Sequence, residues 1–128
     1  MRAMTMALIL SLTAGIASAK PHLRDVPEID GTLLAVGIAD EIRKNCPDIS
    51  ARMFKALTLV NSLKGRARDL GYSEEEIDAY RKSDVEKARL KAARATYLQD
   101  GGVTAGQPAS YCALGRQEIE KAARSAPC

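Results

Sequence analysis

Apolar residues recur at intervals of three and four positions through most of this chain, and that spacing limits its fold more than any other feature. The clearest stripe runs from Ile49 to Leu70 and places its apolar side chains on one face of a helix. No stretch shows the sustained alternation of apolar and polar residues that is typical of strands. We therefore predict an all-α fold, a small bundle of four to five helices.

Start and stop signals divide this periodic region into segments. A first helix is expected over residues 32–45 and a second over residues 49–70. Ser73 and Ser83 each precede a glutamate by three residues, which is the signature of a capping box. We expect a break near Ser83 rather than one continuous helix over 73–99. The other signals are Asp30, Asp48 or Ser50, and Ser110 as N-caps, Gly71 after the second helix, a glycine-rich loop over 100–109, and Gly37 as a close-packing site.

The first residues of the chain have the composition of a secretory signal. Met1 and Arg2 form a positive start, an uncharged apolar run follows, and Ala17-Ser18-Ala19 matches the small residues that a signal peptidase recognises. We predict cleavage between Ala19 and Lys20 and export to the periplasm, with no membrane insertion after cleavage. The expected organisation is a signal peptide over 1–19, an extended leader over 20–29, a helical domain over 30–124 and a flexible tail over 125–128.

Three cysteines are the whole thiol inventory, and export would place them in an oxidising compartment. Cys46 and Cys112 both lie on the apolar side of expected helices, so we predict a disulfide between them. On the chain-entropy model, closing a loop of this length contributes about 4 kcal/mol to stability. Cys128 is the last residue, and it can stay free, displace one partner of the bridge, or join two chains in a covalent dimer. The rival interpretation is a redox-active thiol at Cys112, close to a helix start.

Residue types that carry catalysis do not form a recognisable set in this sequence. The single histidine, His22, lies in the proline-flanked leader, and no cysteine belongs to a CxxC or Cys/His cluster of a structural zinc site. The motifs of hydrolases, zinc proteases and nucleotide-binding loops are also missing. We therefore predict no enzyme activity, no catalytic residue, no cofactor and no metal ligand.

Some charged residues admit a functional as well as a structural interpretation. Asp40-Glu41 and Glu74–Glu76 can act as acid and base, but they fit a helix surface and a helix start better. Lys87, Lys91 and Arg94 share one side of a helix, and we interpret them as solvated surface because acids lie nearby. The formal net charge of +3 is small and well mixed, so a nucleic-acid partner is not expected.

Four segments carry a recognisable pattern: VGIADEIR before Cys46, ISARM at 49–53, LGYS at 70–73 and YCALGR at 111–116. Together they resemble a domain-of-unknown-function family of small exported alphaproteobacterial proteins. The resemblance spans nearly the whole mature chain and implies an exported helical domain with no established activity. Cys128 lies outside this pattern.

Three functions are compatible with these features. The favoured hypothesis is a non-enzymatic interaction or accessory module that binds a protein partner in the cell envelope, because docking needs only a rigid helical surface. The second is a periplasmic stress chaperone, similar in plan to acid-response holdases of the HdeA type, in which acid exposes the apolar stripes. The third is a thiol redox protein. None of the three hypotheses specifies an oligomeric state.

Overall fold

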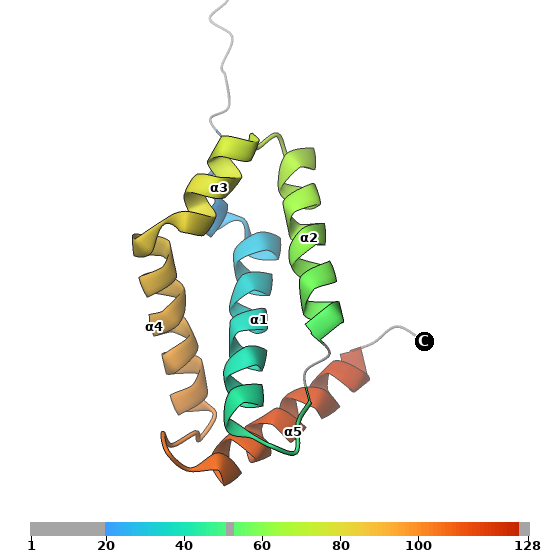
Figure 1. Cartoon of the computed structure of the whole chain (residues 1–128), viewed down its shortest axis with the longest axis vertical. Helices are drawn as coiled ribbons and strands as arrows, with labels where there is room; N and C mark the ends of the chain where they lie inside the picture. Colours follow the sequence, from blue (N-terminus) through green and yellow to red (C-terminus); the bar gives the residue numbers. More distant parts are fainter. Residues whose placement is uncertain (1–19, 51–52, 126–128) are drawn as a thin grey trace, which may run out of the picture.

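The computed structural model describes residues 20–50 and 53–125, and within them the chain forms five α-helices, one short 3-10 helix and no strand. The predicted all-α bundle is confirmed. In Figure 1, α1 runs through the middle between α4 and α2, while α3 lies at one end and α5 crosses the other. The elements in order are η1 (Leu23–Asp25), α1 (Pro27–Asn45), α2 (Met53–Asp69), α3 (Glu74–Lys82), α4 (Asp84–Asp100) and α5 (Pro108–Ser125).

The first long helix, α1, begins earlier than the sequence signals suggested. Pro27 starts the helix instead of extending the leader, because proline has a helical φ and its missing N–H needs no partner in the first turn. Residues 27–29 are therefore helical, and the leader ends at Val26, which is the N-cap. Asp30, predicted to be the N-cap, lies inside α1 and is free to interact with other elements.

The expected break near Ser83 is confirmed, since α3 ends just before it and α4 begins just after it. Ser73 forms a complete capping box: its hydroxyl accepts the N–H of Glu76, and the Glu76 carboxylate accepts the N–H of Ser73 at 2.7 Å. The Ser83 hydroxyl accepts the N–H of Glu86 at 3.2 Å. Two separately capped helices let the chain turn, so that α4 packs along α1.

Both α2 and α4 end at a glycine in the left-handed region of backbone space. Gly71, with a φ of 95°, donates its N–H to the Arg68 carbonyl, and the next residue, Tyr72, donates to Ala67. Gly102, with a φ of 86°, ends α4 with the same pair of hydrogen bonds. This is the Schellman arrangement, which satisfies carbonyls at a helix end and favours glycine because a left-handed backbone is least strained without a Cβ. The predicted role of Gly71 is confirmed.

The last helix, α5, begins at Pro108, so Ser110 is not its N-cap as predicted. The Ser110 hydroxyl instead accepts the N–H of Thr104 at 3.0 Å and donates to the Gln107 carbonyl at 2.7 Å. These bonds hold the loop between α4 and α5 against the start of α5. The predicted signal peptide with Ala19, the junction at 51–52 that bears on the cap of α2, and Cys128 lie outside the described residues.

Buried side chains form one cluster at each end of α1, which we call the disulfide-end core and the leader-end core. On α5, Tyr111 and Leu114 face the disulfide-end core, whereas Ile119 is 56% exposed. The disulfide-end core comprises Ile38, Ile42, Cys46, Leu98, Tyr111, Cys112 and Leu114. The leader-end core comprises Leu23, Ile29, Ala67, Tyr72 and Ile77.

Candidate functional site

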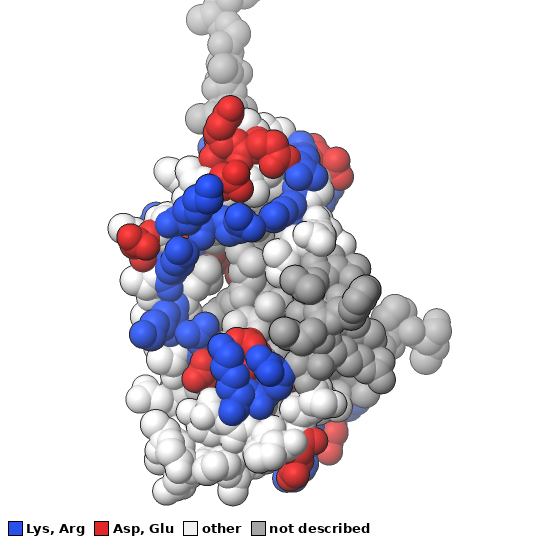
Figure 2. All heavy atoms as spheres, in the orientation of Figure 1, with Lys and Arg blue, Asp and Glu red and all other residues white. Residues whose placement is uncertain are grey.

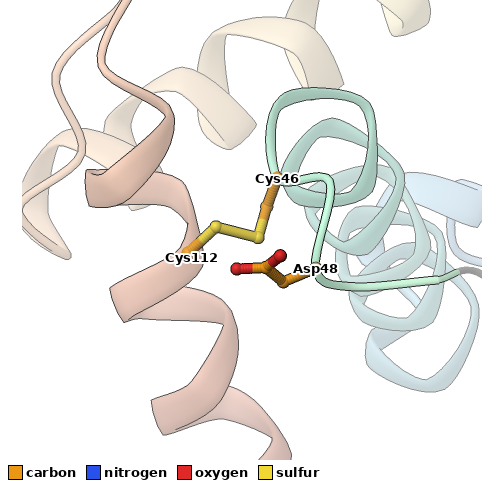
Figure 3. Close-up of side chains that lie close together, drawn as sticks. All are labelled: Cys46, Asp48 and Cys112. Atoms are coloured by element: carbon orange, nitrogen blue, oxygen red, sulfur yellow. A yellow bond between two sulfur atoms is a disulfide. The ribbon is translucent and has the colours of Figure 1, made fainter.

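The two cysteines singled out by the sequence form a disulfide that joins the end of α1 to the start of α5 (Figure 3). Cys46 is 1% and Cys112 6% exposed, and their Cα atoms are 5.2 Å apart. A redox-active disulfide must be accessible, because thiol–disulfide exchange begins when a partner thiolate attacks one of its sulfur atoms. Burial of both cysteines therefore favours a structural bridge over the predicted rival of a reactive thiol.

A carboxylate stands beside this bridge, since Asp48 points toward the two sulfur atoms (Figure 3). One oxygen of Asp48 and the two sulfur atoms lie within 4.8 Å of one another. Arg116 approaches the same carboxylate at 3.7 Å from α5. Because both sulfur atoms are bonded to each other, the trio offers a metal ion only one ionised ligand in this oxidation state.

A network of charged side chains ties α1, α3, α4 and the leader together at the other end of the molecule. Arg89 of α4 forms a bidentate pair with Asp30 of α1, with one N–O distance of 3.2 Å, and binds Glu86 at 2.8 Å. Arg24 of the leader pairs with the second oxygen of Glu86. Tyr80 of α3 donates its hydroxyl to Asp30 at 2.6 Å. Each acid thus has two partners from different elements.

The network shifts the pKa values of its side chains. Burial opposes ionisation of Asp30, but hydrogen bonds from Arg89 and Tyr80 outweigh it, so the pKa of that carboxyl falls below its ordinary value. The hydrogen bond from Arg89 likewise lowers the pKa of Glu86. Burial, together with the hydrogen bond to Asp30, raises the pKa of Tyr80. Both acids are therefore ionised and Tyr80 is neutral at pH 7.

Glu86 is the one buried charged residue in the described part of the chain, and sequence reasoning placed it only as the acid of a second capping box. Its N–H is used at the Ser83 cap, but its carboxylate turns to Arg24 and Arg89 instead of returning to the N-cap. The sequence pattern also did not predict the roles of Tyr80 and Asp30. All three depend on partners more than fifty positions away or on another helix.

The leader is fastened to the corner between α2 and α3. Lys20 donates to the Gly71 carbonyl at 2.8 Å and to Glu76 at 2.9 Å, and its ammonium lies 5.0 Å from the ring centre of Tyr72. The Tyr72 hydroxyl donates to the Pro21 carbonyl. The predicted first residue of the mature chain is thus held in place by the domain.

Other acids and bases weighed from the sequence have ordinary partners. Asp40 accepts from Arg43 and Lys44 of its own helix, and these hydrogen bonds lower the pKa of Asp40. Glu74 pairs with Arg68 at the junction of α2 and α3. His22 is exposed in the leader. These residues do not converge on one place.

Arg94 differs from the solvated surface that the sequence suggested. Its side chain is 29% exposed and lies across Gly37 of α1, where an added Cβ would come within 3.3 Å of Nη1. Gly37 is thus the close-packing site expected from the sequence. Lys87 and Lys91 are exposed as predicted. On the face shown in Figure 2, Lys and Arg side chains form a broken band from the α2–α3 end down along α4, with a further cluster over the lower half of α1 and acidic side chains beside them.

An apolar groove of about 230 Å³ runs along α1 toward α4 and α5. Ile38 and Ile42 are buried beneath it, whereas Ala35 and Ala39 on its edge are exposed. Glu118 of α5 accepts a hydrogen bond from Tyr97 of α4 at the groove, and this bond raises the pKa of Tyr97. The remaining lining residues are Gly31 and Leu34.

Comparison with known proteins assigns the chain to a family. Residues 21–126 match the family of unknown function DUF5333. The chain belongs to this family. The DUF5333 match spans all the α-helices of the described residues and both cysteines of the bridge, and it confirms the expected domain of unknown function. Searches of curated proteins and of solved structures found no match.

No helix within 20–50 and 53–125 combines the length and the apolar character that a bilayer crossing requires.

Proposed function

We propose that this DUF5333 protein is an exported, non-enzymatic accessory module that docks onto a protein of the cell envelope. The apolar groove along α1 is the observation that supports this proposal. An exposed apolar groove bounded by packed helices is a surface on which a partner segment can bury apolar area.

The groove suits an apolar helix that carries one lysine or arginine. Gly31, Ala35 and Ala39 recur every four residues on α1, so small side chains follow one line and allow another helix to approach closely. Glu118 is the one charged residue among the described residues lining the groove. A cation on the partner would pair with this carboxylate and set the orientation of the bound helix.

The test is site-specific photocrosslinking in cells that export the protein. A photoreactive amino acid at position 35 should yield an adduct with one envelope protein, whereas the same group at the exposed position 92 of α4 should not. A purified peptide from that protein should then bind with a measurable Kd.

Matched variants decide whether the groove is responsible. Ala39→Glu places a charge in the groove and should abolish the position-35 adduct, while Ala92→Glu, also at an exposed position but outside the groove, should leave it unchanged. Equal adducts from positions 35 and 92, or a position-35 adduct that survives Ala39→Glu, would contradict the proposal.

The charged network favours a second candidate function, an acid-activated periplasmic chaperone. Protonation of Asp30 and Glu86 would remove the acids that tie the leader, α3 and α4 to α1, and loosening would expose the leader-end core. Light scattering from an aggregating client protein below about pH 4 is the test. A chaperone suppresses the scattering, and unchanged scattering would rule out this candidate.

A further inference from the structure

A second cavity, of about 480 Å³, lies between α1, α4 and the loop that joins α4 to α5. It has no lining residue in common with the α1 groove. Leu98, Ala95 and Val103 form apolar parts of its wall, while Lys91 and Arg94 lie at its α4 side. Its volume is in the range of cavities that bind small organic molecules.

Tyr111 is an unusual part of this wall. The residue is 7% exposed and packs in the disulfide-end core, yet it lines the cavity. Its hydroxyl has no hydrogen-bond partner among the residues that the structure describes. The hydroxyl oxygen is therefore open to the cavity, where it can donate its proton to a ligand or to solvent.

The charges around the cavity favour an anion. Lys91 has no ion pair within the described residues, and Arg94 meets Glu41 only at 3.9 Å. Two cations and one acid leave a net charge of +1 at the cavity. Inorganic phosphate has no apolar body to lie against Ala95, Leu98 and Val103, whereas a carboxylate with an apolar body can meet both the cations and this apolar wall.

Gly37 keeps Arg94 at the cavity. Because α1 has no Cβ at this position, the Arg94 side chain lies flat across the helix and its guanidinium stays near the opening. An alanine at position 37 would bring a methyl group within 3.3 Å of Nη1 and push the guanidinium aside.

We propose that this cavity binds a small monocarboxylate with an apolar body. Arg94 and Lys91 hold the carboxylate, the Tyr111 hydroxyl donates to it, and the apolar body lies against Leu98 and Val103. This site is independent of the docking function proposed above, because the two surfaces share no residue.

The experiment is a titration of the oxidised exported protein with 3-phenylpropionate, followed by amide chemical shifts in NMR. Saturable shifts at residues 94–111 with a Kd of about 0.1–1 mM are expected for a ligand of this size. The neutral isostere 3-phenylpropanamide and inorganic phosphate should each bind at least tenfold more weakly. Absence of saturable shifts at 94–111, or equal affinity for the amide, would overturn the proposal.

Variants test the assigned residues. Arg94→Gln should weaken binding about tenfold, and Tyr111→Phe about three- to tenfold, because each removes a donor to a charged acceptor. Gly37→Ala should weaken binding through displacement of Arg94. Lys87→Gln is the matched control, since Lys87 is exposed on the same helix and does not line the cavity. Circular dichroism verifies folding, and equal affinities of Arg94→Gln and Lys87→Gln would refute the site.

Discussion

The two ends of α1 are held by different kinds of interaction. At the disulfide-end core, a covalent bond and closely packed aliphatic side chains join α1 to α5. At the leader-end core, a smaller apolar cluster is accompanied by the network centred on Arg89 and Glu86. Covalent and apolar contacts contain no titrating group, whereas carboxylates lose their charge in acid. The comparison teaches that reduction and acid should weaken opposite ends of one small domain.

Loss of the disulfide is expected to have the largest effect. The double variant Cys46→Ser and Cys112→Ser should lower the free energy of unfolding by about 4 kcal/mol, because the unfolded chain regains the entropy of a long loop. Urea unfolding followed by circular dichroism measures the change. Cys128→Ser is the control and should leave the midpoint unchanged. A double variant as stable as the oxidised protein would show that the disulfide does not hold this end.

Adding a methyl group to the closely packed disulfide end is expected to cause the second-largest loss of stability. In Gly115→Ala the new methyl group would collide with Ile49 and lie 2.9 Å from Ile42, so the helices must move apart. We expect a loss of about 1–3 kcal/mol in thermal or urea unfolding. Gly65→Ala on α2 meets open space and should instead stabilise the protein by about 0.5–1 kcal/mol. Equal effects of the two substitutions would contradict close packing at Gly115.

The leader end should respond to acid. Because the folded-state pKa of Asp30 lies below its unfolded value near 4, its stabilising contribution is complete above about pH 4 and is lost as pH falls through the lower value. Asp30→Asn should cost about 2 kcal/mol at pH 7 and flatten the acid dependence. Amide exchange of α3 should increase in acid before that of α5. Simultaneous exchange of both helices would contradict the difference between the two ends.

The smallest expected effect concerns single hydroxyl groups. Tyr72→Phe removes the hydrogen bond to the Pro21 carbonyl and should cost about 1 kcal/mol at the leader end. Tyr111→Phe, at the disulfide end, should change stability by less than about 0.5 kcal/mol because its hydroxyl has no protein partner in the described residues. Thermal unfolding compares the two. A larger loss for Tyr111→Phe would reverse the assignment.

Local signals in the sequence were reliable where the physics is local. The break at Ser83, the capping box at Ser73 and the glycine end at Gly71 follow from hydrogen bonds between residues a few positions apart. The predicted start of α1 is too late, because a proline is compatible both with an extended leader and with the first turn of a helix, and Pro27 takes the second role. The prediction that Ser110 is the N-cap of α5 is wrong because the hydroxyl of a serine near a helix start can form hydrogen bonds with the preceding loop instead.

The amino-acid sequence by itself determined the helical class and most helix ends, because apolar spacing and capping signals are local features of the chain. It favoured the pairing of Cys46 with Cys112 through the apolar position of both cysteines, and the structure shows this pair. Only the tertiary structure decided that Glu86 is buried between two arginines, that Arg94 crosses Gly37 and that the Tyr111 hydroxyl faces a cavity. Burial and charge pairing depend on which faces of distant helices come into contact. Helix periodicity identifies the apolar face of one helix, but not the helix that packs against it.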